Sequence, residues 1–225
     1  MTRRPCVVEL VGAPGSGKSS VAVAIGGLPG VVVVKDHRRS DLPVLIWSAV
    51  TAGRVLFASP PHGVSRRRWI AWVGRCRAAH RIVRRRLAAG AQVVVLDQGP
   101  AYTLGRMVES ASRDAAVARW HRARTVEVGR LLDAVVVLDG DTKLLAARLR
   151  SRPKRHRADE LEAATAASYL DGERTMARTI ATSLASEGVM VVYLDAARSL
   201  AENVAVIEAV LHTDQTSIRE DGGAE

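Results

Sequence analysis

Residues 5–20 read PCVVELVGAPGSGKSS and join an apolar run, a glycine-rich loop and the start of a helical pattern. The run Pro5–Val11 is continuous and leads into glycine, which is typical of a buried parallel strand. Residues Gly12–Ser19, GAPGSGKS, match the spacing G-x-x-x-x-G-K-[ST]. Because a strand precedes the motif and a helical pattern follows it, the stretch predicts a phosphate-binding loop.

Each part of the predicted loop has a physical role in holding nucleotide phosphates. The glycines allow backbone N–H groups to surround the β-phosphate, and the N-terminus of the following helix adds about half a positive charge. Lys18 would reach the β- and γ-phosphate oxygens, and Ser19 would ligate Mg²⁺. The sequence therefore predicts a nucleoside triphosphate site, with ATP as the expected nucleotide. The residues predicted to contact it are Gly12, Ala13, Pro14, Gly15, Ser16, Gly17, Lys18, Ser19 and Ser20.

The rest of the chain alternates short apolar runs with helical patterns. Four more core strands are predicted at residues 31–34, 93–96, 134–138 and 189–194. Helical periodicity covers residues 19–25, 43–90, 111–132 and 200–211, with Gly90 as a natural stop. Strands that alternate with helices imply an α/β fold with three layers, in which a five-stranded parallel sheet lies between two layers of helices.

Acidic residues follow three of the apolar runs, namely Asp36, Asp97 and Asp195. The carboxyl ends of parallel strands meet at one edge of a sheet, so we expect polar chemistry to collect there beside the phosphate loop. Asp97 is the candidate to hold Mg²⁺ together with Ser19, directly or through water. The alternative for Asp97 is a turn-forming role before the following Gln, Gly and Pro.

The positive charge of the chain predicts anionic partners. The formal net charge is +10, and no Asp or Glu lies between Leu42 and Leu96. Two interpretations remain open: a nucleic-acid surface, or solvated arginine faces on an ordinary anion-binding enzyme. Aromatic residues form only 4% of the chain and do not interleave with the arginines, which disfavours single-strand binding by stacking.

Cysteine usage and hydropathy favour a soluble cytoplasmic protein. Cys6 and Cys76 are far apart in sequence and have no Cys or His partner at metal-ligand spacing, so neither a disulfide framework nor a zinc site is expected. The longer apolar stretches are interrupted by Gly, Pro or Arg, and none is predicted to span a membrane.

Missing motifs narrow the class of nucleotide-binding protein. Asn203 is the only asparagine, so the NKxD motif with which GTPases read guanine is absent. The LSGGQ signature of transporter ATPases is also absent, and the chain is too short for the second subdomain of ring-forming mechanical ATPases. A small-molecule kinase remains the leading class.

Three motifs carry a resemblance to a known group of enzymes: GAPGSGKS at residues 12–19, VVVLDQGP at 93–100 and ARLRSRPKRHRAD at 147–159. With these motifs the chain resembles the P-loop nucleoside and nucleotide kinases, and its layout is similar to that of thymidylate kinase. The resemblance implies the P-loop NTPase fold and an Arg-rich lid at about 147–159 that closes over the phosphates. It places Arg148, Arg152 and Arg157 in this lid as catalytic residues, and it places Arg198 in the loop that flanks the adenine in the related kinases.

Physics supports a lid of this kind, because a phosphoryl transition state gains negative charge that mobile arginines can stabilise. The alternative is a solvated, arginine-rich helix end. Gln98 stands where thymidylate kinases usually have Arg, and Arg106 is the candidate to contact an acceptor phosphate in its place.

The segment at about 36–91 is where the related kinases build their acceptor pocket from helices. Asp36 is the candidate catalytic base in it. If Asp36 takes a proton, the acceptor is an alcohol, whereas if it only orients arginines, the acceptor is a monophosphate. The sequence leaves both open. Trp47, Trp69 and Trp72 could stack on a base, but their helical spacing favours core packing.

Together these observations predict an ATP- and Mg²⁺-dependent phosphotransferase that acts on a small acceptor, such as a nucleotide, a nucleoside or a related metabolite. The alternative is a nucleic-acid-directed P-loop ATPase or polynucleotide 5′-hydroxyl kinase that uses the Arg-rich helix at residues 66–86. We expect one P-loop kinase domain over residues 1–212 and a flexible tail over 213–225. The sequence is compatible with a homodimer.

Overall fold

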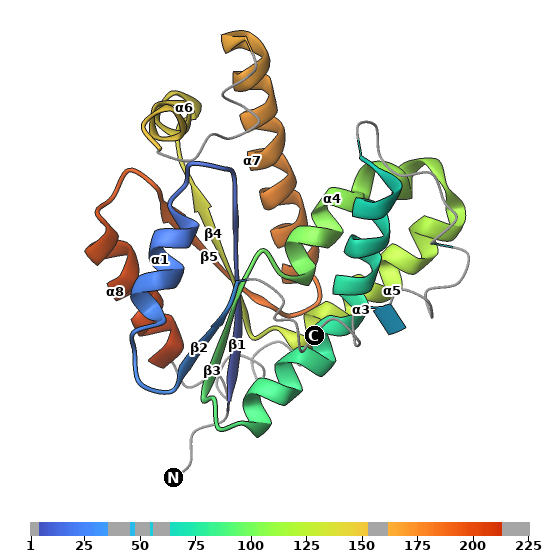
Figure 1. Ribbon diagram of the computed structural model, residues 1–225, viewed down its shortest axis with the longest axis horizontal. Helices are drawn as coiled ribbons and strands as arrows, with labels where there is room; N and C mark the ends of the chain where they lie inside the picture. Colours follow the sequence, from blue (N-terminus) through green and yellow to red (C-terminus); the bar gives the residue numbers. More distant parts are fainter. Residues whose placement is uncertain (1–4, 36–45, 48–54, 56–63, 153–161, 213–225) are drawn as a thin grey trace, which may run out of the picture.

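The computed structural model describes residues 5–35, 46–47, 55, 64–152 and 162–212 (Figure 1). A parallel sheet of five strands in the order β2-β3-β1-β4-β5 forms its centre. The strands are β1 (Cys6–Gly12), β2 (Val31–Val34), β3 (Val93–Asp97), β4 (Ala134–Asp139) and β5 (Met190–Asp195). Every predicted strand is present with bounds that differ by at most one residue, so the predicted five-stranded parallel sheet is confirmed.

Helices cover both faces of the sheet and give the predicted three layers (Figure 1). One face carries α1 (Lys18–Ile25) and α8 (Leu200–His212). The opposite face carries α3 (Arg66–Ala88), α4 (Pro100–Arg113), α5 (Ala115–Leu131) and α7 (Ala163–Ala185). The short helix α6 (Thr142–Arg150) follows β4 and packs against α7.

Alternate residues of β1 supply the two halves of the core. Val7 and Val11 pack on the face of α4 and α7, while Val8 and Leu10 pack on the face of α1 and α8. Since β1 lies between β3 and β4, both faces of the strand are buried, which explains a run that is apolar except for Glu9. Each fully buried side chain of this size contributes about 1.5–3 kcal/mol of transfer free energy.

The helical stretch expected over residues 111–132 is two helices, and that expectation is corrected. Asp114 adopts an extended conformation between α4 and α5, with a φ of −135°. Its carboxylate accepts hydrogen bonds from the backbone N–H groups of Ala116 (2.7 Å) and Val117 (3.1 Å), which caps α5. The apolar periodicity continues across this break, because α4 and α5 pack against each other and share the core.

The helical stretch expected over 43–90 is continuous only from Arg66 within the described residues. Ser65 caps α3 by accepting a hydrogen bond from the N–H of Arg68 at 3.4 Å. The predicted stop at Gly90 is confirmed, since α3 ends at Ala88 and Gly90 has a φ of +95°.

Core packing is confirmed for two of the three tryptophans. Trp69 is 0% exposed and Trp72 5%, and both belong to one apolar cluster. Trp47 is 57% exposed, so the prediction that it packs in the core is wrong. Ile46 beside it is equally exposed, and helical spacing alone did not reveal which face would be covered.

Cys6 and Cys76 are both free thiols. No helix in the described part of the chain is both long enough and apolar enough to cross a membrane.

Candidate active site

The GAPGSGKS loop connects the end of β1 to the start of α1 at the carboxyl edge of the sheet. It fits closely against neighbouring backbone. A Cβ on Gly12 would lie 2.2 Å from the carbonyl oxygen of Leu138, and one on Gly15 would lie 2.6 Å from that of Leu145. Both glycines have positive φ angles, +144° and +88°. Only glycine meets both demands at these positions, so the loop has the geometry that the motif predicts.

Lys18 is folded back onto this loop and is buried. Its Nζ donates to the carbonyl oxygens of Gly12 (2.7 Å) and Ala13 (2.8 Å) and to Ser16 Oγ (3.3 Å). Burial lowers the pKa of Lys18 to about 8, and the negative charge of Asp97 opposes the shift. An ammonium group has three protons to donate, so a bound phosphate oxygen must replace at least one of these loop contacts.

Ser19 and Asp97 meet at the first turn of α1. Ser19 Oγ donates to Asp97 Oδ2 at 3.4 Å, and Asp97 is only 5% exposed at the end of β3. Its other oxygen, Oδ1, is buried and has no hydrogen-bond partner among the described residues. A hydroxyl beside a carboxylate with an unused oxygen is a donor set that suits Mg²⁺. No group of three or more His, Cys, Asp or Glu in the described part could hold a metal, so nucleotide oxygens and water would complete the shell.

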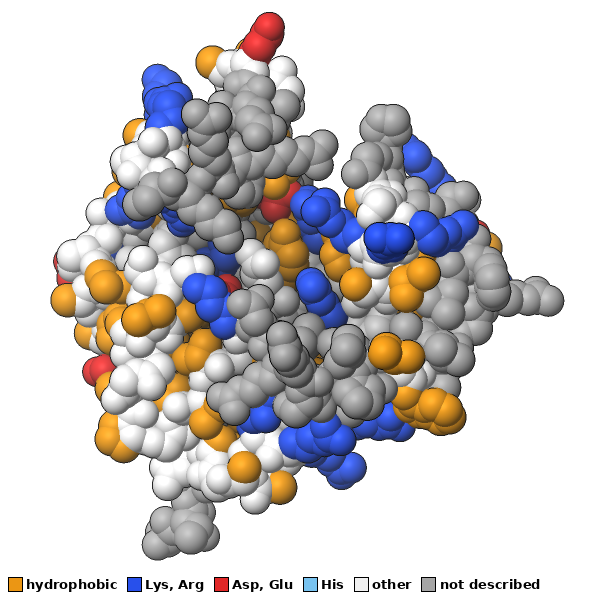
Figure 2. All heavy atoms as spheres, viewed as in Figure 1, with side chains coloured by type: hydrophobic (Ala, Val, Ile, Leu, Met, Phe, Trp, Pro, Cys, Tyr) orange, Lys and Arg blue, Asp and Glu red, His pale blue; other side chains and the backbone are white. Residues whose placement is uncertain are grey.

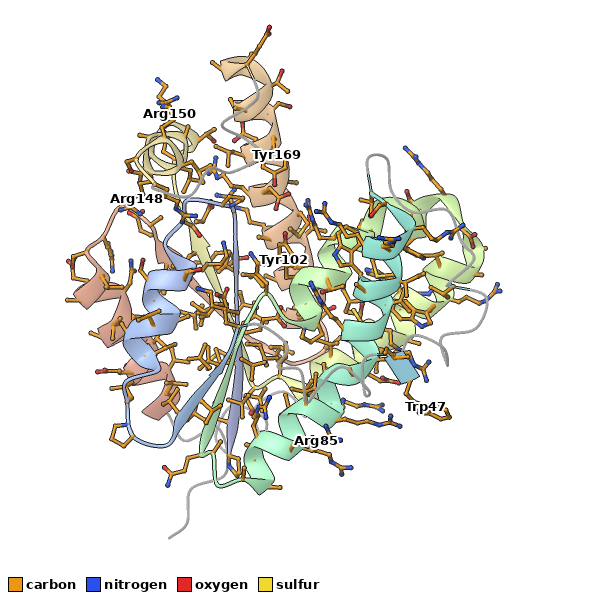
Figure 3. The ribbon with its side chains drawn as sticks, viewed as in Figure 1. Trp47, Arg85, Tyr102, Arg148, Arg150 and Tyr169 are labelled. Carbon is orange, nitrogen blue, oxygen red and sulfur yellow. The ribbon has the colours of Figure 1, made fainter. Side chains whose placement is uncertain are left out.

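One cavity, of about 290 Å³, lies on the α6 side of the loop, and we call it the α6 cavity. Three arginines named by the sequence analysis line it: Arg148 from α6, Arg152 just beyond α6 and Arg198 after β5. Figure 3 shows Arg148 on the side of α6 that faces the loop and Arg150 on the far side. The remaining lining residues are Gly15, Ser16, Gly17, Ser20, Val21, Leu138, Ser151, Ala196, Leu200 and Asn203.

A second cavity, of about 320 Å³, lies on the α4 side of the same loop, and we call it the α4 cavity. Helices α3, α4 and α7 converge on it. The loop residues Lys18 and Ser19 line it as well, and Tyr102 of α4 and Tyr169 of α7 are labelled in Figure 3. The other lining residues are Pro14, Gly15, Gly17, Arg68, Trp72, Arg75, Gln98, Arg106 and Arg152.

Arg106 occupies a fixed position in the α4 cavity. Its guanidinium lies 5.8 Å from the ring centre of Trp72 and 5.8 Å from that of Tyr102. It forms an ion pair with Glu173 of α7, which is 2% exposed. Burial raises the pKa of Tyr102 to about 12, so its hydroxyl stays protonated. Arg106 therefore lines the α4 cavity in a position that residues of α3, α4 and α7 determine together, and its contact with an acceptor stays a prediction.

Glu9 is a buried carboxyl in the middle of β1 that the sequence analysis did not single out. It is 0% exposed and accepts hydrogen bonds from the N–H groups of Ala101 (2.9 Å) and Tyr102 (2.8 Å). Burial raises the pKa of Glu9 to about 8, against the opposing effect of these backbone hydrogen bonds. Glu9 thus anchors the N-terminus of α4. A lone charged residue inside the apolar run VVELV was the available signal in the sequence.

Two other acids end strands at this edge. Asp139, which the sequence analysis did not name, ends β4 and forms ion pairs with Arg174 and Arg178 of α7. Burial would raise its pKa, but the hydrogen bonds from these arginines outweigh that effect and hold the pKa below its usual range. Asp195 accepts a hydrogen bond from the N–H of Ala197 at 2.8 Å. Both carboxylates therefore bind groups of the protein at the end of a strand, and neither lines one of the two cavities.

Two residues named in the sequence analysis, Asp36 and Arg157, lie outside the described residues, as does most of the segment at 36–63. The others come together at one edge of the sheet. Ser19 donates a hydrogen bond to Asp97, the charge of Asp97 acts on Lys18, and Arg148, Arg152 and Arg198 line the α6 cavity.

Comparison with solved structures shows the fold. A deoxyadenosine kinase from M. mycoides with bound dATP matches with a TM-score of 0.55 and 13% sequence identity, covering 92% of this chain and 99% of that chain. The same enzyme with bound dCTP matches with a TM-score of 0.53 and 13% identity, over 91% and 98%. The structure with the products dCMP and a flexible dCDP matches with a TM-score of 0.55 and 13% sequence identity, covering 91% of this chain and 98% of that chain.

Among curated proteins, no sequence matches the chain. A family model described as "AAA domain" matches residues 7–177, which include the phosphate loop, β3, β4 and α6. The fold is that of the P-loop nucleoside and nucleotide kinases, and the chain belongs to the AAA domain family.

Proposed function

We propose that the protein is an ATP-dependent phosphotransferase that moves the γ-phosphoryl group of ATP to a small acceptor. One observation carries this proposal: the α6 cavity and the α4 cavity meet at the phosphate loop and share Gly15, Gly17 and Arg152. A nucleotide in the α6 cavity would direct its terminal phosphate towards Lys18 and Ser19, which line the α4 cavity. Donor and acceptor would then approach each other across the loop, as in-line transfer requires.

The charges around this meeting point suit the chemistry of phosphoryl transfer. The transition state is loose and spreads negative charge over the transferred oxygens. Lys18 and Arg152 lie at the loop, Arg148 lines the α6 cavity, and Arg157 would join them if the segment at 147–159 closes as a lid. Mg²⁺ held by Ser19 and Asp97 would neutralise part of the phosphate charge. The acceptor would bind and be oriented in the α4 cavity.

The α4 cavity favours a small acceptor that carries both a ring and polar groups. Trp72, Tyr102 and Tyr169 supply aromatic surface, while Arg68, Arg75 and Arg106 supply positive charge. A nucleoside, a nucleotide or a related metabolite has this chemistry. Solved structures of similar fold include those of a deoxyadenosine kinase with bound dATP, dCTP or dCMP, which supports the same class. In this proposal Asp36 is the base for an alcohol acceptor, residues 1–212 form the kinase domain, and residues 213–225 form a tail.

Turnover of Mg·ATP by the purified protein tests the proposal. The acceptor panel would hold nucleosides, deoxynucleoside monophosphates, sugar and shikimate-type alcohols, and 5′-hydroxyl oligonucleotides. We expect ADP release that depends on one acceptor class and vanishes in Lys18→Ala. The matched control is Lys143→Ala, because Lys143 is exposed on α6 and lines neither cavity. ADP release that no acceptor stimulates would contradict the proposal.

A second candidate function, action on nucleic acid, is favoured by the exposed face of α3. Arg67, Arg81, Arg84 and Arg85 are exposed there, and Figure 2 shows Lys and Arg side chains gathered over this helix. Arg85 extends away from the sheet in Figure 3. A protein that contacts six phosphates should lose affinity for an oligonucleotide by about 10³-fold between 50 and 200 mM salt. A small acceptor in the α4 cavity should show a much weaker salt dependence.

A further inference from the structure

Gln98 has a backbone conformation that side chains rarely adopt. Its φ is +60°, and it is the only residue other than glycine with a positive φ in the described part of the chain. For a residue with a Cβ, this left-handed conformation costs about 1–2 kcal/mol of conformational free energy. Such conformations persist only where the surrounding structure imposes them, and they concentrate at functional sites.

The surroundings of Gln98 do impose this conformation. Before it, Asp97 is buried at the end of β3. After it, Gly99 has no space for a side chain, because a Cβ there would lie 2.8 Å from Glu9 Oε2 and 2.9 Å from the Cβ of Leu96. Pro100 then starts α4, whose N-terminus is held by Glu9. The buried carboxyl of Glu9 therefore determines the path of the loop on one side and β3 determines it on the other.

This arrangement presents the Gln98 side chain to the site and leaves it exposed. Gln98 lines the α4 cavity together with Lys18 and Ser19. It also lines a smaller, mostly apolar cavity of about 30 Å³ between β2 and α3, whose walls include Val34, Ala79 and Ile82. No hydrogen bond joins its amide to another described residue, although the loop that carries it is anchored on both sides.

The chemistry of this amide differs from that of its neighbours. Arg68, Arg75, Arg106 and Arg152 line the same cavity and offer only donors with positive charge. A glutamine amide is neutral and can donate and accept at the same time. It therefore matches a hydroxyl, an amide or a ring nitrogen next to a carbonyl, and it gives no advantage to a phosphate.

We propose that Gln98 binds the acceptor directly, and that its amide recognises an uncharged polar group while the arginines hold any anionic part. This inference rests on the proposed phosphotransferase function. It makes Gln98 a determinant of acceptor specificity, held in a strained conformation at the cost of stability.

Two variants separate a role in binding from a role in the fold. Gln98→Gly removes the strain and the amide together. We expect its unfolding temperature to rise by about 2–4 °C. We also expect its KM for the acceptor to rise about 10-fold, with the KM for ATP unchanged. Gln98→Asn keeps an amide and tolerates the left-handed region, but its shorter side chain should leave the acceptor KM above that of wild type.

Gln92→Gly is the matched control. Gln92 is exposed at the other end of β3 and its φ is not positive. The same substitution there should lower the unfolding temperature by about 2 °C and leave both KM values unchanged. An unchanged acceptor KM in Gln98→Gly, or a lower unfolding temperature, would overturn the inference while the kinase function stands. Absence of acceptor-dependent turnover in wild type would instead overturn the proposed function and this inference with it.

Discussion

The two cavities that flank the phosphate loop are of similar size, but they are built in different ways. The α6 cavity is formed around the loop, the start of α1 and the short segments after β4 and β5. The α4 cavity is formed by side chains of α3, α4 and α7, which are separate in sequence and meet only in the folded protein. Both cavities join distant segments, but one consecutive motif forms the centre of the α6 cavity, whereas the packing of three helices forms the α4 cavity.

This difference bears on how each side should respond to mutation. Gly15, Ser16 and Gly17 of the loop line the α6 cavity, so we expect backbone N–H groups to carry much of the phosphate binding there and a single side chain to carry a small share. The α4 cavity depends on a few buried polar contacts, such as Arg106 with Glu173 and Glu9 with α4. Loss of one partner in a buried contact leaves the other unsatisfied, so we expect larger effects on the α4 side.

Arg152→Ala should have the largest effect, because Arg152 lines both cavities and so belongs to both sides of the comparison. We expect kcat to fall about 10²- to 10³-fold, since one donor to the transferred phosphoryl group is lost. Steady-state turnover with the acceptor that the panel selects measures this. Arg150→Ala is the control, since Arg150 is exposed two residues earlier and lines neither cavity. Equal rates in the two variants would remove Arg152 from the catalytic machinery.

Arg106→Ala should destabilise the α4 side by about 3 kcal/mol, because it leaves the buried Glu173 without its ion-pair partner. Urea unfolding measures the change, and acceptor affinity should fall with it. Arg124→Ala is the matched control. Arg124 pairs with Glu127, which is 44% exposed, so its loss should cost less than about 1 kcal/mol. If both variants lose the same stability, the pair with the buried Glu173 contributes no more than the pair with the exposed Glu127.

Glu9→Gln should cost about 1–3 kcal/mol at pH 5, because each oxygen of the protonated carboxyl can accept from one N–H group at the start of α4, whereas the NH2 group of the amide can only donate. Because the pKa of Glu9 is raised, the stability difference between wild type and Glu9→Gln should also depend on pH. Between pH 4.5 and about 8 the folded protein holds a proton that the unfolded chain releases. Wild-type stability therefore falls as pH rises through this window, and its advantage over Glu9→Gln should shrink.

Urea unfolding of both proteins at pH 5 and pH 8 measures that change. Glu187→Gln serves as the control, because Glu187 is exposed. A stability difference for Glu9→Gln that is constant or grows with pH would contradict the assigned ionisation. ATP affinity should be unchanged in the variant, since Glu9 supports only the α4 side.

Arg198→Ala should have the smallest effect. Arg198 is exposed at the edge of the α6 cavity, and an exposed charge contributes at most about 1 kcal/mol. We expect the KM for ATP to rise up to about 5-fold while the KM for the acceptor stays constant. A larger rise for ATP would mean that single side chains matter as much on the α6 side as on the α4 side.

The strands and the phosphate loop could be predicted because their signals are local. An unbroken apolar run marks a strand buried on both faces, and the loop motif lies within eight consecutive residues. The break at Asp114 could not be predicted in the same way, since the apolar spacing of α4 and α5 reflects a shared core. The exposure of Trp47 was missed for the same reason, because spacing does not reveal which face has a partner.

By itself, the sequence determined the fold class, the five strands, the nucleotide loop and the candidate pair Ser19 and Asp97, since each depends on residues close together along the chain or at the ends of strands. Only the tertiary structure decided the strand order, the anchoring of α4 by Glu9, the pairing of Arg106 with Glu173 and the strained backbone of Gln98. The contacts of Glu9 and Arg106 join residues that are 67 to 93 positions apart, and the conformation of Gln98 is a backbone angle. Neither a long-range contact nor a single backbone angle produces a periodic pattern in the sequence.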